Sequence, residues 1–339
     1  MTIILKLEDM PQLTPQQVWN LTETELLNHL NTEIYKPISN TIRFYAPSFT
    51  YYKTKHNCSS TTDFPTISVT GNACALNCKH CGGKVLETMH PALTPQELFD
   101  VAAKLKRNGA KGVLVSGGCL PDGSLPLDDF VSVLGRFKSE LGLTVFVHTG
   151  IVKRETTVAL KEAGIDAALI DVIGSAETVE KIYNLKGTVQ DYADSLKALQ
   201  EAELTVVPHV IVGLNEGKLD GELQALEVIQ QIKPSALVII AFMPIHGTAM
   251  AETPPPRPAD IAKVAALARQ MFPQTPLVLG CMRPKGKSRG ETDVLALKAG
   301  VDAIAFPSEA AVEYAKSMSY RTGFSSYCCA QMYLDAIKP

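Results

Sequence analysis

Three cysteines in one short segment are the residues best suited to chemistry. Cys74, Cys78 and Cys81 are separated by three and by two residues. Thiols at this spacing on one loop can bind three irons of a single 4Fe–4S cubane and leave the fourth iron without a protein ligand. Structural zinc sites and electron-transfer clusters normally have four protein ligands, so the open iron indicates a coordinated small molecule. The alternative is a zinc site completed by His80 or His90.

The elements that must position these thiols are a series of short apolar runs. Eight runs rich in Val, Ile and Leu begin at residues 66, 111, 144, 167, 205, 236, 276 and 303, and helical patterns separate them. This spacing suits strand–helix units with right-handed crossovers, and continuous apolar runs are typical of parallel strands covered on both faces. We therefore predict an α/β fold, a (β/α)8 TIM-type barrel over residues 61–310. The alternative is a six-unit partial barrel with an appended lobe.

Both ends of the chain extend beyond this barrel. Residues 1–60 are expected to form a helical extension, in which Thr14 caps a helix that begins at Pro15. Residues 311–339 are expected to form a short tail over the barrel mouth.

Barrels of this kind carry their chemistry where the strands end. The polar, glycine and cysteine residues of this chain gather at those positions. They are Ser116, Gly117, Gly118 and Cys119 after the second strand, His148 after the third, Asp171 in the fourth, Gly213 after the fifth and Cys281 after the seventh. A carboxylate such as Asp171 in an apolar strand needs a polar partner. Arg283 and Lys285 are expected at the rim, either solvated or in contact with a ligand.

Five cysteines remain outside the triad. Cys119 and Cys281 are both expected on the barrel rim, and Cys328 and Cys329 are adjacent in the tail. If the tail folds back, these four thiols can hold an auxiliary cluster. The alternatives are small buried apolar side chains and a disulfide between the adjacent cysteines, whose geometry would be strained. We assign no role to Cys58.

The composition excludes several classes of protein. Lys and Arg number 32 against 35 Asp and Glu, a net charge of −3, so the chain is not a basic nucleic-acid binder. Hydrophobic residues make up 46%, which excludes intrinsic disorder. The amino-terminal segment does not resemble a signal peptide, and residues 238–245 are too short an apolar run to span a membrane. We expect a cytoplasmic protein whose cysteines stay reduced.

The spacing of the cysteine triad just after the first strand resembles that of the radical S-adenosylmethionine (SAM) enzymes. The resemblance implies a 4Fe–4S cluster whose open iron binds SAM, and reductive cleavage of SAM to methionine and a 5′-deoxyadenosyl radical. It also implies SAM contacts, which we place at His80, Ser116, Gly117, Gly118, His148, Asp171 and Gly213. His80 stands where an aromatic residue is usual, and Cys119 stands where an acidic residue is common.

Features outside the triad narrow the resemblance. Eight strands resemble the group that contains biotin synthase and the hydrogenase-maturation enzymes, although the barrel cysteines of biotin synthase are not reproduced. Residues 42–49, the triad context and residues 280–284 are most similar to the archaeal-type lipoyl synthase components. These paired proteins insert two sulfurs into a protein-bound octanoyl chain. The implied partners are a second radical SAM subunit, an octanoylated lipoyl-carrier protein and a reductant such as ferredoxin or flavodoxin.

The predicted reaction follows from the inertness of an unactivated C–H bond. Such a bond has no useful acidity, so a carbon radical must remove its hydrogen, and the substrate radical would then attack a sulfide of the auxiliary cluster. One alternative is a biotin synthase-like or cofactor-maturation radical SAM enzyme that acts on a small molecule. Another is a non-catalytic iron–sulfur subunit, which would not cleave SAM.

Overall fold

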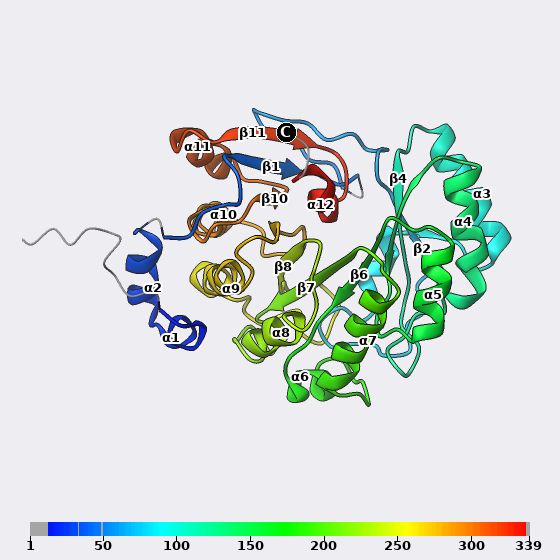
Figure 1. Cartoon of the computed structure of the whole chain (residues 1–339), viewed down its shortest axis with the longest axis horizontal. Helices are drawn as coiled ribbons and strands as arrows, with labels where there is room; N and C mark the ends of the chain where they lie inside the picture. Colours follow the sequence, from blue (N-terminus) through cyan, green and yellow to red (C-terminus); the bar gives the residue numbers. More distant parts are fainter. Residues whose placement is uncertain (1–12, 33, 49, 337–339) are drawn as a thin grey trace, which may run out of the picture.

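The computed structural model describes residues 13–32, 34–48 and 50–336. Its central feature is one curled sheet with eleven parallel strands (Figure 1). The strands are β1 (Thr41–Tyr45), β2 (Thr66–Ser68), β3 (His90–Pro91), β4 (Gly112–Ser116), β5 (Thr144–His148), β6 (Ala167–Asp171), β7 (Val206–Val212), β8 (Leu237–Ala241), β9 (Leu277–Leu279), β10 (Ala303–Ala305) and β11 (Arg321–Ser325). Their order in the sheet is β11-β1-β10-β9-β8-β7-β6-β5-β4-β2-β3.

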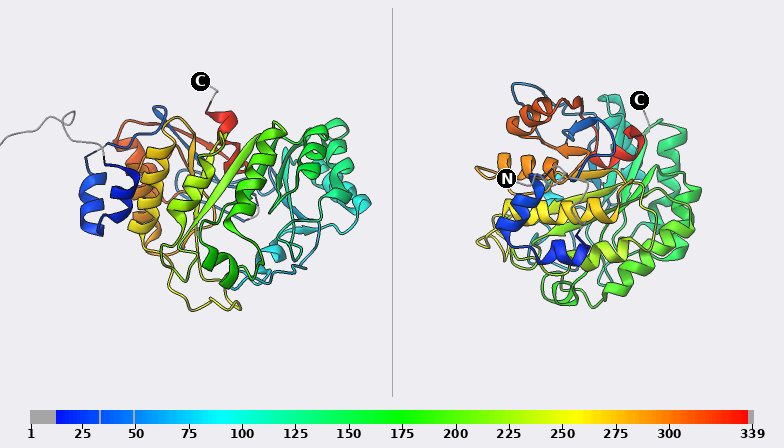
Figure 2. Two further views of the ribbon diagram at one scale, coloured as in Figure 1. Left: turned by 60° about the horizontal axis from the view of Figure 1, so that its bottom comes forward. Right: turned by 60° about the vertical axis from the view of Figure 1, so that its left-hand side comes forward.

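Helices pack around this sheet, most of them on its outer face (Figures 1 and 2). They are α1 (Pro15–Asn20), α2 (Glu23–Leu30), α3 (Pro95–Arg107), α4 (Val131–Ser139), α5 (Arg154–Glu162), α6 (Ala176–Lys181), α7 (Val189–Glu201), α8 (Glu222–Ile229), α9 (Pro258–Met271), α10 (Arg289–Lys298), α11 (Glu309–Ser317) and α12 (Met332–Asp335). The α/β class, the parallel sheet and all eight predicted strands are confirmed.

The sheet differs from the predicted barrel in that it is an open curl with two additional strands at one edge. β1 pairs with β10 and with β11, so it lies inside the range that was expected to be helical. The two edges, β11 and β3, do not pair with each other among the described residues. Contacts between Ser60 and Ser326 (2.9 Å, backbone N–H to Oγ) and between the rings of Phe64 and Tyr327 connect the segment before β2 with the tail.

The amino-terminal helices pack on α9. Thr14 caps α1, which begins at Pro15 as predicted, but the chain breaks at Leu21 and continues as a second helix, α2. Lys263 of α9 donates hydrogen bonds to the carbonyl oxygens of Trp19 (2.9 Å) and Leu21 (2.6 Å), which are left free where α1 ends. These helices therefore brace the outer layer and lie away from the concave side of the sheet.

The tail folds back onto the barrel, but it enters the concave interior of the sheet instead of only covering the mouth. Tyr45 Oη donates to Asp335 Oδ2 (2.6 Å), and Tyr333 Oη donates to the carbonyl oxygen of Asp166 (3.0 Å), the residue before β6. α12 therefore reaches the amino-terminal end of the strands. Small side chains on the inner face, including Ala236 and Ala303, leave room for it.

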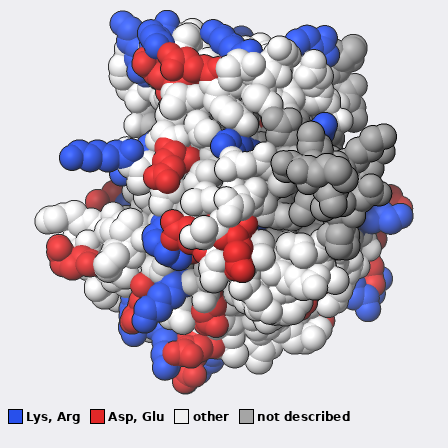
Figure 3. Space-filling model, turned by 90° about the vertical axis from the view of Figure 1, so that its left-hand side faces the viewer, with Lys and Arg blue, Asp and Glu red and all other residues white. Residues whose placement is uncertain are grey.

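Two further observations concern the surface. On the face shown in Figure 3, acidic and basic side chains are interspersed and separated by uncharged surface, in keeping with the small net charge. None of the helices in the described part of the chain is long and apolar enough to cross a membrane.

Candidate active site

The cysteine triad lies on the loop that follows β2. Residues after α6 hold this loop in place: the side-chain amide of Asn184 donates to the carbonyl oxygens of Leu76 (3.1 Å) and Asn77 (3.0 Å). The Cys78 thiol donates to the Tyr183 carbonyl oxygen at 3.5 Å. Asn77 has a φ of +44°, a left-handed conformation that asparagine tolerates better than most residues and that lets the loop turn back. The loop shape is therefore set by contacts outside it.

The loop that follows β4 packs directly against the triad loop. Ser116 ends β4, and the loop begins with Gly117, Gly118 and Cys119; the Gly118 N–H donates to Thr70 Oγ1 at 2.6 Å. A Cβ on Gly118 would lie 2.6 Å from Cys74 Cβ and closer still to the Ala73 carbonyl oxygen. Glycine is therefore required at this point by close approach.

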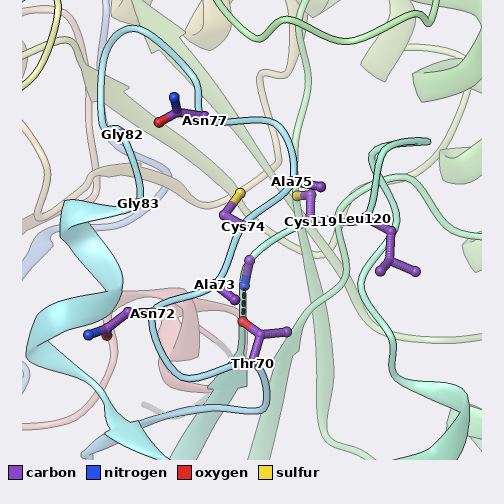
Figure 4. A pocket seen from close by; sticks show the side chains of 11 residues that line it. Thr70, Asn72, Ala73, Cys74, Ala75, Asn77, Gly82, Gly83, Cys119 and Leu120 are labelled. Carbon is purple, nitrogen blue, oxygen red and sulfur yellow. Dashed lines mark hydrogen bonds between the residues drawn. The ribbon is translucent and has the colours of Figure 1, made fainter.

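Cys119 belongs to the same cluster of thiols as the triad. The Cys119 carbonyl oxygen accepts a hydrogen bond from the Ala75 N–H at 2.8 Å, and its thiol is hydrogen-bonded to the sulfur of Cys74. Figure 4 shows the two side chains on neighbouring loops beside a cavity of about 580 Å³ that both residues line. The predicted grouping of Cys119 with Cys281, Cys328 and Cys329 is therefore wrong, because β4 is the sheet neighbour of β2 and not of β9.

The four thiols form two hydrogen-bonded pairs of unequal acidity. The hydrogen bond from Cys119 lowers the pKa of Cys74 to about 5, and the hydrogen bond from Cys78 lowers the pKa of Cys81 to about 4. The same hydrogen bonds, together with burial, raise the pKa values of Cys119 and Cys78. One sulfur of each pair is thus prepared to act as a thiolate, the form that binds metal.

His80 lies beside the pair Cys78 and Cys81. Its ligand nitrogen and the two sulfurs are all within 4.8 Å of one another, which keeps the predicted zinc alternative compatible with the geometry. The His80 ring packs against Tyr183 with 5.1 Å between centroids, and its buried Nδ1 has no hydrogen-bond partner. His90 forms part of β3 and is exposed, so it is not part of this cluster.

A second polar cluster lies at the ends of β5, β6 and β7. His148 Nε2 is 3.4 Å from Asp171 Oδ1, and a ligand atom of His209 lies within 4.8 Å of both side chains. Asp171 and His209 are direct partners in the sheet register. Burial raises the pKa of Asp171, but the charge and hydrogen bond of His148 outweigh it and lower the pKa overall. The Oδ1 atom of Asp171 is buried, and apart from this 3.4 Å contact with His148 it has no hydrogen-bond partner among the described residues.

His209 was not among the predicted site residues. Burial lowers its pKa to about 4, so the ring is neutral, and its Nδ1 contacts the Val207 carbonyl oxygen at 3.1 Å. A histidine inside the run 206–212 interrupts an otherwise apolar strand. That interruption, together with the pairing of consecutive strands, was the signal that could have identified it.

Gly213 lies under a loop and does not face the cavity. Its φ is +70°, and a Cβ at this position would come within 2.7 Å of Pro256. Its N–H donates to Glu222 Oε1 at 2.8 Å, while the other oxygen of Glu222 accepts from the Asp220 N–H at 2.7 Å. Gly213 and the buried Glu222 therefore shape the loop after β7, and burial raises the pKa of Glu222 to about 7.

The remaining thiols form a second group inside the curled sheet. The Cys281 thiol follows β9 and is hydrogen-bonded to Cys329 of the tail, and Cys329 is in turn hydrogen-bonded to its neighbour Cys328. All three pack with the apolar residues of the inner face. Cys58 is exposed and lies outside both groups.

Arg283 is buried near this second group, contrary to the expectation that it lies at the rim. Its guanidinium donates to Asp293 Oδ1 at 2.8 and 3.0 Å and to the carbonyl oxygens of Gly280 (2.6 Å) and Ala305 (2.7 Å). Both charged side chains are fully buried. Arg283 therefore holds the loop after β9, which carries Cys281.

The residues around the first group fit an iron–sulfur cluster with a bound organic ligand. The donors are thiols on one loop, which is the ligand set that iron–sulfur clusters use. The cavity is bordered by glycines, and Asp171 offers a buried oxygen whose 3.4 Å contact with His148 does not satisfy it as a hydrogen-bond acceptor. The observed donor set and space are therefore consistent with a cluster together with SAM.

Comparisons with known proteins agree with this arrangement. The model of the family described as the radical SAM superfamily matches residues 68–223. Biotin synthase from Neorickettsia sennetsu is 26% identical over 243 residues, which cover 70% of this chain and 74% of that protein. Biotin synthase from Coxiella burnetii is 27% identical over 223 residues, covering 64% and 68% of the two chains.

Solved structures show the same fold. Methylornithine synthase superimposes with a TM-score of 0.61 at 15% identity, over 94% of this chain and 96% of that one. The FeFe-hydrogenase maturase HydG from Carboxydothermus hydrogenoformans superimposes with a TM-score of 0.63 at 16% identity, over 94% and 77%. The cysteine spacing and the family match identify a radical SAM domain over residues 68–223, and the chain is similar in sequence to biotin synthases.

Proposed function

We propose that this radical SAM enzyme inserts sulfur into a protein-bound octanoyl group, as a component of a lipoyl synthase. Cys74, Cys78 and Cys81 would hold the 4Fe–4S cluster. When bound, this cluster supplies the electron that cleaves SAM and yields a 5′-deoxyadenosyl radical. The protein's part is to bind and orient SAM and substrate and to exclude water.

The SAM contacts are proposed for the residues around the first cavity. Ser116, Gly117 and Gly118 form the loop that packs on the triad, and their closeness to Cys74 would bring the methionine end of SAM beside the cluster. Asp171 has an unpartnered oxygen that can accept hydrogen bonds from ribose hydroxyls, and His148 would orient it. His80 has a free ring nitrogen and would complete the binding site, whereas Gly213 would act indirectly by shaping the loop after β7.

The observation that carries the sulfur-insertion proposal is the second thiol group. Cys281, Cys328 and Cys329 meet inside the sheet, on strands and a tail that are separate from the triad loop. A sulfur-donating reaction needs a source of sulfide beside the substrate, and three thiols suit an auxiliary iron–sulfur cluster. The inner face around them is apolar, which suits an acyl chain. The partners would be a second radical SAM subunit, an octanoylated carrier protein and a ferredoxin or flavodoxin.

The second candidate is a biotin synthase-like reaction on a small molecule. The named relatives support it, because they are biotin synthases and align over about two thirds of this chain. It also needs a radical beside an inert C–H bond, so the first cavity serves both candidates. The two differ in whether the substrate is attached to a protein.

Anaerobic iron and sulfide content tests the second cluster. The reconstituted wild type should contain about eight irons per chain, and Cys281→Ala combined with Cys329→Ala should contain about four. Cys58→Ala is the matched control, since its thiol is exposed and lies outside both groups, and it should keep the wild-type content. About four irons in the wild type would contradict the sulfur-donor proposal.

A substrate assay separates the two candidates. The reconstituted protein, with reductant and SAM, is incubated with an octanoyl-lysine peptide or with free small acids, and the products are analysed by mass spectrometry. Sulfur addition to the peptide supports the lipoyl synthase assignment. Sulfur addition to a free acid alone supports the biotin synthase-like alternative, and SAM cleavage without either product would contradict both.

A further inference from the structure

We propose that Cys119 is an exchangeable fourth ligand, which binds the iron left open by the triad and gives it up when SAM arrives. The inference rests on the proposed 4Fe–4S cluster and goes beyond it. It assigns this chain a resting state in which four thiolates hold the cluster. The argument depends on where Cys119 lies and on what else surrounds it.

The backbone places Cys119 beside the cluster site. Residues 73–75 and 118–119 are in direct contact: the Ala75 N–H donates to the Cys119 carbonyl oxygen at 2.8 Å, and Gly118 leaves no room for a Cβ against Cys74. The Gly118 N–H also donates a hydrogen bond to Thr70 Oγ1 at 2.6 Å. The Cα position of Cys119 is therefore fixed relative to the triad loop by a backbone contact with Ala75 and by the contact of Gly118 with the Thr70 hydroxyl.

The side chain of Cys119 points toward the other thiols. It interacts with the thiols of Cys74 and Cys81 and with Asp171, and it lines the same cavity of about 580 Å³ as Cys74. Figure 4 shows Cys74 and Cys119 at this cavity on adjacent loops. Cys119 is half-buried: it packs against the core on one side and lines the cavity on the other, so its thiol stays accessible from the cavity.

The alternative ligands for an open iron are a ring nitrogen of His80, backbone carbonyl oxygens and water. The backbone donors and carbonyl groups of the loop are largely engaged, since Gly118 donates to Thr70 and the Cys119 carbonyl accepts from Ala75. Water is a hard oxygen ligand, whereas iron in these clusters prefers thiolate. In the absence of SAM, the nearest thiolate is therefore expected to occupy the fourth iron.

The exchange is balanced in protons and involves no electron transfer. SAM arrives with an α-ammonium group, which must lose a proton before its nitrogen can bind iron. The departing Cys119 thiolate takes that proton and leaves as a neutral thiol. The Fe–S bond to Cys119 breaks, and bonds from the SAM amino and carboxylate groups form. The cluster keeps its oxidation state throughout.

Such a ligand would protect the cluster from oxidation. When a 4Fe–4S cluster with an uncapped iron gives one electron to an oxidant, it releases that iron as Fe²⁺ and leaves a three-iron cluster. A thiolate on the fourth iron opposes this release because it supplies a covalent link to the protein. The prediction is therefore a difference in iron retention, measured without any turnover.

The test is a ferricyanide titration without SAM, followed by iron analysis and EPR detection of the three-iron cluster. To report on the first site alone, Cys281→Ala with Cys329→Ala forms the background for every variant. In that background, Cys119→Ala should lose about one iron in four on oxidation, while the parent should retain its four. SAM should restore retention in Cys119→Ala, because SAM covers the same iron. Cys58→Ala should behave like the parent.

Two outcomes distinguish a failure of this inference from a failure of the proposed function. If the parent binds no four-iron cluster, the proposed function fails. If the parent binds the cluster but loses iron as readily as Cys119→Ala, the capping role of Cys119 is overturned and the cluster assignment stands.

If Cys119→Ala does not take up iron, a second variant and a second measurement still test the proposal. Cys119→Ser keeps a smaller oxygen ligand and should retain iron to an intermediate degree. In the parent, isotope-labelled water should show no hyperfine coupling to the reduced SAM-free cluster by ENDOR. A water ligand detected there would contradict the proposal without any change at Cys119.

Discussion

The close contact between Gly118 and the triad loop can be tested by a substitution that adds one methyl group to Gly118. Gly118→Ala adds a single methyl group at a position where the Cβ would lie 2.6 Å from Cys74 Cβ and 2.7 Å from Cys74 Cα. Apolar carbons in contact normally lie about 3.5–4.0 Å apart. The contact with the Ala73 carbonyl oxygen would be shorter still, so the loops after β2 and β4 must separate by at least about 1 Å to admit the methyl group.

The size of the expected effect follows from this displacement. Misplacing reacting groups by about 1 Å can cost on the order of 100-fold in rate. The obstacle is backbone and Cβ atoms of residues 73 and 74, which cannot rotate away as the end of a long side chain can. We therefore expect Gly118→Ala to lower the rate of reductive SAM cleavage by about 100-fold, with a smaller loss of iron.

The assay measures 5′-deoxyadenosine formation, iron content and the unfolding temperature of the same preparations. Gly135→Ala in α4 is the matched control, because its nearest contacts are 3.5 Å away and alanine suits a helix. It should keep the wild-type rate and gain up to about 1 kcal/mol of stability. Wild-type rate and iron in Gly118→Ala would refute the argument that close packing of these loops positions SAM.

Three further predictions concern the support of the site. Asp293→Ala leaves Arg283 as an uncompensated buried charge and should lower the free energy of unfolding by about 3–5 kcal/mol, whereas Glu140→Ala, at the exposed ion pair with Arg136, should cost less than about 1 kcal/mol; equal losses in denaturant titrations would contradict this. The pKa of Glu222 is about 7 in the folded protein, above the ordinary value of 4.5, so its protonated form stabilises the fold at low pH. That contribution should decline by roughly 3 kcal/mol as the pH rises from about 4.5 to 7. Glu222→Gln should show a flatter dependence of stability on pH, and an unchanged slope would argue against the pKa shift. Asn184→Ala removes two hydrogen bonds to the triad loop and should speed iron loss to a chelator, and unchanged loss would show that the loop holds its shape without them.

The strands could be predicted from the sequence because their signal is local. Each of the eight predicted runs begins within one residue of an observed strand, as at Thr66 and Ala303. β1 and β11 could not be found in this way. Their stability comes from pairing between residues 41–45 and 321–325, which are far apart in the chain, and β11 is polar and partly exposed.

The candidate site could be predicted only in its first group of residues. The spacing of the three cysteines is sufficient to predict a cluster site. The residues that surround Cys119, in contrast, depend on the order of the strands in the sheet. Sequential strands are usually adjacent, so β4 was the expected neighbour of β2, and this rule already favours the pair Cys74 and Cys119. The burial of Arg283 could not be inferred, because it depends on Asp293 reaching back from α10.

The extra strands explain how one fold can hold two groups of thiols. The interior of a closed eight-stranded barrel is filled by its own side chains. In this chain, β1 and β11 widen the sheet to an open curl, and small residues such as Ala236 and Ala303 line the inner face. The tail occupies that added space and brings Cys328 and Cys329 to Cys281, while Tyr45 and Tyr333 fix its far end. A closed barrel with the same strands would leave the tail outside, so the second thiol group depends on the sheet staying open.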